Sequence, residues 1–326
     1  MESAGAERPT TETDLIFNIV WTGEVFHHLR WFLLSLFDQT SCRYRFLVNN
    51  CTAASIREME EFAAAYPDRV VELMECPYGW MVPHGTALDV ALDNRDDGEF
   101  FCFIDADIKA SGPFLGDFLD RLGSLDALTS GVEVWTDVNT LREEEPGVGG
   151  RHFYDHDGFV FGSPHFAMYR RSALDATRER WDIGFHVASK RDLSEEGWNR
   201  LVELGKDKWV YDTAKVFNIL FQADGHQLAH EEHDALVHIG GLSHFLAPPE
   251  IDFTDAEAVA SRGKPLWVNG DLVVHDRAAV AEFTAEMLKE LDAGRSAPEI
   301  PPGTDGPLVE KLRFVRDEMI DMVRPR

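Results

Sequence analysis

Alternation between short apolar runs and helix-like segments constrains the fold of this chain more than any other feature. Four apolar runs lie at 14–20, 45–48, 70–74 and 100–104. The segments between them have helical spacing of apolar residues or helix end signals, at 29–37, 52–66 and 86–92. Strands that alternate with helices are typical of an α/β domain with a mostly parallel sheet. We therefore predict this fold class.

The ends of the predicted strands carry the first functional signal. In open α/β sheets, ligands bind beyond the carboxyl ends of the strands. Small, polar or acidic residues follow three of the four runs, at 21–24, 49–50 and 105–107. The run at 100–104 is uninterrupted and apolar, as in strands that are buried on both faces. We therefore expect the site at this edge of the sheet.

Asp105-Ala106-Asp107 follows the most hydrophobic of these strands. Alternate residues of an extended segment point the same way, so both carboxylates would face one cleft. Two converging carboxylates repel each other unless a proton or a cation lies between them. A hard divalent ion with oxygen ligands suits such a pair. The alternative is a chance pattern on the surface, because the chain has 58 acidic and 31 basic side chains.

Composition limits which kinds of partner and which cellular compartment we expect. A formal net charge of −27 repels the phosphate backbone, so we expect no nucleic-acid partner. The densest apolar run, 29–37, is shorter than the about 20 residues that span a bilayer, and the polar N-terminus is not a signal peptide. The four cysteines are scattered, which favours reduced thiols in a cytoplasmic protein.

Three segments together carry a specific resemblance. Phe101–Ile108 is preceded by 84–92, which begins His84-Gly85-Thr86, and is followed by Gly112-Pro113-Phe114. This arrangement resembles the donor half of GT-A fold glycosyltransferases and is most similar to the family 2 type. The opening strand with Trp21-Thr22-Gly23 also fits, and the resemblance covers about residues 14–245. It implies a Rossmann-like nucleotide-sugar-binding fold, here with a C-terminal helical extension.

The resemblance implies a role for each strand end. Asp105 and Asp107 would hold Mn²⁺ or Mg²⁺ against the diphosphate of a nucleotide sugar, with His238 as a further ligand and His244 as second choice. The residues expected to border the bound donor are Thr22, Glu24, Asn49, Asn50, His84, Gly85, Asp105 and Ala106.

Asp212 is the expected catalytic base. In family 2 enzymes an acidic residue before the last donor-domain helix deprotonates the acceptor hydroxyl, and Tyr211-Asp212 stands where many members carry Glu-Asp. Asp212 is equally suited to cap the helix that follows. Asn49-Asn50 replaces the aspartate that often reads the base, so base preference stays open. No Q-x-x-R-W motif follows, which argues against processive synthesis.

Histidines at 226, 230 and 233 are read as solvated loop residues. His230 and His233 are three apart, whereas the H-E-x-x-H zinc motif requires a spacing of four. In the helix predicted at 308–322, apolar residues recur at helical spacing, and we expect them to pack on the same domain. Homodimerisation, or a cover over the active site, is the alternative for this helix.

The predicted organisation has four parts. They are a disordered tail (1–13), a donor-binding half (14–136), an acceptor-binding half with a mobile loop at 137–158 (137–246), and a C-terminal helical extension (247–326).

The predicted function is transfer of one sugar by a metal-dependent, non-processive, hexosyltransferase-type enzyme. The donor would be a UDP or GDP sugar, and the acceptor the hydroxyl of a small molecule or glycan. A sugar-nucleotide pyrophosphorylase is the rival enzyme, but 21–24 lacks the Gly-rich loop with Arg and Lys that this class carries after its first strand. A non-catalytic nucleotide-binding module is the rival from another class.

Overall fold

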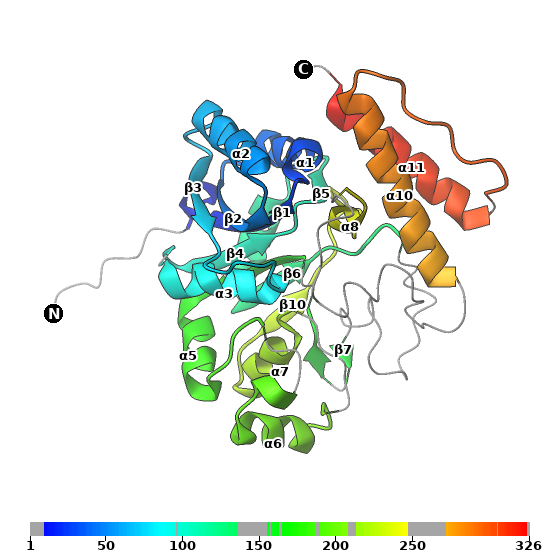
Figure 1. Cartoon of the computed structure of the whole chain (residues 1–326). Coiled ribbons are helices and arrows are strands. Elements are labelled where there is room, and N and C mark those ends of the chain that lie inside the picture. Colours follow the sequence, from blue (N-terminus) through cyan, green and yellow to red (C-terminus); the bar gives the residue numbers. More distant parts are fainter. Residues whose placement is uncertain are drawn as a thin grey trace.

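The structure is a computed structural model. It describes residues 10–95, 97–135, 155–156, 158–162, 165–186, 190–207, 213–246, 272–304 and 306–324. Most of the tail and of the loop predicted at 137–158 lies outside these ranges. Figure 1 shows the arrangement of the elements.

A seven-stranded sheet in the order β10-β6-β9-β4-β1-β2-β3 lies at the centre. Its strands are β1 (Ile16–Gly23), β2 (Arg43–Cys51), β3 (Val70–Glu75), β4 (Phe100–Ile104), β6 (Ala127–Ser130), β9 (Phe166–Arg170) and β10 (Leu228–His230). Neighbouring strands are parallel except at β9, which is antiparallel to both β4 and β6. The predicted α/β class with a mostly parallel sheet is confirmed.

Helices follow the strands along the chain. They are α1 (Phe26–Gln39), α2 (Ala53–Ala65), α3 (His84–Asn94), α4 (Leu115–Leu122), α5 (Arg171–Trp181), α6 (Glu195–Glu203), α7 (Lys215–Ala223), α8 (Leu242–Leu246), α10 (Leu272–Asp292) and α11 (Gly306–Val323), with 3-10 turns η1 (Glu12–Asp14) and η4 (Lys190–Asp192). Thr52 caps α2, because its side chain accepts a hydrogen bond from the Ser55 backbone N–H.

Two small antiparallel pairs complete the described strands. β5 (Ile108–Ala110) pairs with β11 (Leu236–His238), and β7 (Asp155–His156) pairs with β8 (Phe159–Val160). β5 begins directly after Asp107, and Ile108 is the partner of His238 in the register. This pairing brings the end of β11 to the Asp105-Ala106-Asp107 segment.

The sheet separates two hydrophobic cores, and β4 contributes to both. Cys102 and Ile104 belong to a core with α1, whereas Phe101 and Phe103 belong to a core with α3, α5 and α7. All five residues of β4 are buried. The uninterrupted apolar run therefore marks a strand covered on both faces, as predicted.

The C-terminal helices α10 and α11 lie side by side next to α1 (Figure 1). The buried residues of α11 are Leu312, Val315, Met319 and Met322, and they join the core that contains α1. The Lys109 ammonium on β5, which is buried, donates to Glu318 Oε2 on α11 at 2.6 Å. The predicted packing of this helix on the rest of the chain is confirmed. Among the helices that the structure describes, none is long and apolar enough to cross a membrane.

Candidate functional site

Four segments meet at the carboxyl edge of the sheet. Asp105 follows β4, Glu133 follows β6, and His238 is the last residue of β11. His165 precedes β9, which pairs Phe166 with Ile104. Because β9 is antiparallel to β4, its first residues lie where β4 ends. The edge therefore gathers carboxylates and imidazoles from distant parts of the chain.

The predicted metal ligands lie together at this edge. His238 Nε2 lies 3.3 Å from Asp107 Oδ1 and 3.9 Å from Asp105 Oδ2. His238 is 1% exposed and Asp107 is 5% exposed. The other Asp107 oxygen, Oδ2, accepts a hydrogen bond from the Leu242 backbone N–H at 3.3 Å. This bond leaves Oδ1 directed at the imidazole.

His165 links two carboxylates. Its Nδ1 lies 3.0 Å from Asp105 Oδ2, and its Nε2 lies 2.7 Å from Glu133 Oε1. Burial would lower the pKa of His165, but the charge of Glu133 and the hydrogen bond to Asp105 raise it to about 10. For the carboxyl groups of Glu133 and Asp105 burial acts in the opposite direction and would raise the pKa. His165 nevertheless keeps both pKa values below their ordinary values. The two carboxylates therefore favour the charged form of His165, and His165 favours the ionised form of Asp105 and Glu133.

His84 approaches Asp105 from the opposite side. It is the first residue of α3, and its Nε2 lies 3.4 Å from Asp105 Oδ1. Asp105 thus has one oxygen near His84 and the other near His165. The side chain of Asp105 keeps 25% exposure, so it remains accessible to a ligand.

The start of α3 is held by residues 185–186. The Asp89 carboxylate on α3 accepts hydrogen bonds from the backbone N–H groups of Phe185, at 2.8 Å, and His186, at 3.1 Å. A Cβ atom at Gly85 would lie 2.4 Å from the Phe185 carbonyl oxygen. Only glycine lets the two backbones approach this closely. Gly85 therefore has a packing role that fixes the neighbouring His84.

Gly85→Ala is expected to lower the free energy of unfolding by about 1–3 kcal/mol, because the new methyl group meets a backbone carbonyl that cannot move freely. Gly116→Ala on α4 is the matched control, since a Cβ there meets nothing within 4 Å. The control is expected to be neutral or slightly stabilising, because alanine is the better helix former. Urea unfolding of both variants measures the difference. Equal midpoints would contradict the packing role.

The predicted nucleoside side lies at the ends of β1 and β2. Thr22 and Asn49 are partners in the register of these strands. The Asn49 side chain donates to the Val82 carbonyl at 2.8 Å and accepts from the Val82 N–H at 2.9 Å, so it anchors the loop before α3. Asn50 is exposed with a left-handed φ of 56°, and Glu24 is also exposed. Contact of these residues with a nucleoside stays a prediction.

Two predicted residues cannot be placed. Asp212 and the side chain of His244 lie outside the described parts of the structure. Between the two candidate histidines, the described geometry brings His238 to the aspartates.

The interpretation of His230 as a solvated loop residue was wrong. His230 ends β10, and its Nδ1 lies 3.1 Å from Thr129 Oγ1. Burial, together with the charge of Lys215, lowers the pKa of His230 to about 3. His226 and His233 do lie outside helices and strands, but both are only partly exposed, and each faces an aspartate.

Sequence reasoning missed His165 and Glu133. His165 precedes its strand, whereas the predicted site residues follow strands. Glu133 follows β6, a strand that the sequence analysis did not predict. The only available signal was the short apolar segment at 166–169 after His165, which does not by itself reveal an antiparallel strand beside β4.

The donor set fits a divalent cation. Ligand atoms of Asp105, His165 and His238 all lie within 4.8 Å of one another. Both His165 nitrogens already face carboxylates, which makes Asp107 the better third ligand. Glu133 Oε2 and His238 Nδ1 are buried without a hydrogen-bond partner among the described residues. A buried carboxylate with an unpartnered oxygen, as at Glu133, is the environment that a hard cation stabilises.

No protein family model matches the chain, and no curated protein matches it. Solved structures with a similar chain path include the galactosyltransferase LgtC with donor and acceptor sugar analogues (13% identity, TM-score 0.45, 75% of this chain and 93% of that chain). A mannosyltransferase from Pyrobaculum calidifontis, with GDP-Man and Mn²⁺, is also similar (13% identity, TM-score 0.44, 98% of this chain and 75% of that chain). A third is 4-diphosphocytidyl-2C-methyl-D-erythritol synthase from Anaerococcus prevotii (11% identity, TM-score 0.39, 70% of this chain and 91% of that chain).

Proposed function

We propose that this chain is a metal-dependent glycosyltransferase that moves one sugar from a nucleoside-diphosphate sugar to an acceptor hydroxyl. One observation carries the proposal. Asp105, Asp107 and His238 come from two separate strand ends and converge at the carboxyl edge of an α/β sheet, where such folds bind ligands. A surface D-x-D pattern would not bring a buried histidine to both of its carboxylates.

Asp105, Asp107 and His238 would hold Mn²⁺ or Mg²⁺ at this edge. When bound, the ion supplies Lewis-acid stabilisation of the charge that develops on the leaving diphosphate, which is worth several kcal/mol. The surrounding residues prepare these ligands. Leu242 orients Asp107 through its N–H, while His84 and His165 flank Asp105. The site therefore holds the carboxylates of Asp105 and Asp107 in fixed directions.

The finer assignments belong to the same proposal. The donor is a UDP or GDP sugar, bordered by the ends of β1 and β2, and the transfer is non-processive. Residues 14–136 bind the donor and 137–246 bind the acceptor. Asp212 is the general base for the acceptor hydroxyl, and the sequence places it just before α7.

The first test is a thermal-shift titration with UDP, GDP, ADP, CDP and dTDP, each with and without Mn²⁺. A ligand that binds only the folded state raises the free energy of unfolding, by about 2.7 kcal/mol when its concentration is 100 times its Kd. The melting temperature rises accordingly. We expect a shift for one nucleotide that requires Mn²⁺. No metal-linked shift for any nucleotide would refute the proposal.

Product analysis then separates the enzyme classes. With the matching nucleotide sugar, release of the nucleoside diphosphate on addition of an acceptor supports glycosyl transfer. Formation of a nucleotide sugar from a nucleoside triphosphate and a sugar phosphate would instead show a pyrophosphorylase. Metal-linked binding without turnover across a panel of donors and acceptors would show a binding module.

A further inference from the structure

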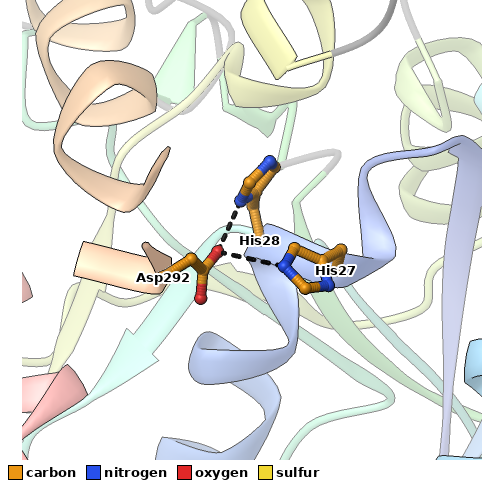
Figure 2. Close-up of side chains that lie close together, drawn as sticks. All are labelled: His27, His28 and Asp292. Atoms are coloured by element: carbon orange, nitrogen blue, oxygen red, sulfur yellow. Dashed lines mark hydrogen bonds and ion pairs between the residues drawn. The ribbon is translucent and has the colours of Figure 1, made fainter. Parts of the chain in front are cut away.

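A second group of ligand-type side chains lies where α10 meets α1. His27 and His28 stand at the start of α1, and Asp292 is the last residue of α10 (Figure 2). Asp292 Oδ2 lies 2.5 Å from His28 Nδ1 and 3.8 Å from His27 Nε2. The three ligand atoms lie within 4.8 Å of one another.

Asp292 is held so that one of its oxygens faces both imidazoles and forms a hydrogen bond with one of them, His28. Its Oδ1 accepts hydrogen bonds from Trp31 Nε1 at 2.6 Å and from Arg30 Nη2 at 3.1 Å. Its Oδ2 faces the two imidazoles, as Figure 2 shows. The Asp292 side chain is only 4% exposed. The carboxylate is thus buried, fixed by two donors on one side and directed at two nitrogens on the other.

Glu58 on α2 adds an outer partner. Its Oε1 lies 3.4 Å from His27 Nδ1, the ring nitrogen that does not face Asp292. In metal sites, a histidine ligand almost always donates its other N–H to a carboxylate, a carbonyl or water, which fixes the tautomer that leaves the metal-facing nitrogen unprotonated. The order Glu58, His27, Asp292 matches this arrangement.

We propose that His27, His28 and Asp292 bind a divalent transition-metal ion, Zn²⁺ by ligand type, with Glu58 as a positioning residue. Two imidazoles and one carboxylate suit Zn²⁺. Tetrahedral ligands at Zn²⁺ bond lengths lie about 3.3 Å apart. The observed separations of 2.5 and 3.8 Å bracket this value, so small side-chain movements complete the site. His27 is 46% exposed, which leaves a position open to water.

The proposed site would link the C-terminal helices to the rest of the chain. His27 and His28 belong to α1, which packs on β1 and β5, whereas Asp292 ends α10, which packs on α11. A bound ion would therefore hold α10 against α1 in addition to their apolar contact. Since binding requires the folded arrangement, the ion is expected to raise the melting temperature. The proposal is independent of the proposed sugar transfer.

The test is a titration of the full chain, freed of metal by a chelator, with Co²⁺ as a spectroscopic probe for Zn²⁺. We expect a visible absorption band from nitrogen-ligated Co²⁺ in wild type. His27→Gln is expected to weaken this binding at least tenfold, and Glu58→Gln by about 10–100-fold, the usual effect of losing an outer partner. Co²⁺ should also raise the melting temperature of wild type more than that of His27→Gln.

Two control variants make the result specific. His226→Gln removes a partly exposed histidine that also faces an aspartate, Asp126, but has no second histidine in its pair. This variant should bind Co²⁺ as wild type does. Asp107→Asn alters the other candidate metal centre and should keep the band that depends on His27. The proposal is overturned if His27→Gln binds Co²⁺ as wild type does, or if Asp107→Asn abolishes all Co²⁺ binding.

Discussion

Asp107→Asn is expected to lower kcat/KM of the proposed sugar transfer by about 1,000-fold and to abolish the Mn²⁺-dependent part of nucleotide binding. The exchange removes one negative charge from a side chain that is 8% exposed and lies 3.3 Å from His238 Nε2. A loss of about 4 kcal/mol of transition-state stabilisation corresponds to three powers of ten in rate. Asparagine keeps an oxygen that can accept the Leu242 N–H, so the fold should survive.

A matched exchange controls for charge. Asp117→Asn on α4 alters a side chain that is 80% exposed, and it should leave turnover and Mn²⁺ dependence unchanged. Steady-state rates at several Mn²⁺ concentrations, together with melting temperatures, provide the comparison. Full metal-dependent turnover in Asp107→Asn would show that the metal assignment is wrong.

Asp97→Ala is expected to cost about 3 kcal/mol of the free energy of unfolding. Asp97 and Arg45 form a pair in which each side chain is 4% exposed. Arg45 Nη1 and Nη2 each lie 2.7 Å from an Asp97 oxygen, and Nη1 also donates to Asn18 Oδ1 at 3.0 Å. Removing the carboxylate leaves a buried guanidinium whose acid partner among the described residues is Glu72. The unpaired charge, rather than the lost attraction, causes most of the cost.

Asp93→Ala is the control for this pair. Asp93 is 56% exposed and pairs with Arg178 at the surface. Exposed pairs of this kind contribute about 0–1 kcal/mol, so this variant should unfold close to wild type. Urea unfolding followed by circular dichroism measures both. If Asp97→Ala and Asp93→Ala share one midpoint, the buried pair does not carry the predicted stability.

The sequence alone predicted the local elements of the first third of the chain. Periodicity and end signals depend on neighbouring residues, so they placed β1 to β4 and the helices between them close to their observed positions. The uninterrupted apolar run at 100–104 predicted a strand buried on both faces, and the pattern after it pointed to Asp105 and Asp107. The choice of His238 depended on a family resemblance rather than on periodicity.

Only the tertiary structure determined what surrounds the two aspartates. His165 reaches both Asp105 and Glu133 because β9 inserts antiparallel between β4 and β6, and strand order is a long-range property that local patterns do not encode. The binding of Asn49 to Val82 depends on where a later loop passes. Asp292 lies beside His27 and His28 although at least 264 positions of the chain separate them. Each of these contacts forms because the buried faces of separate elements pack together, and that packing decides which polar side chains meet.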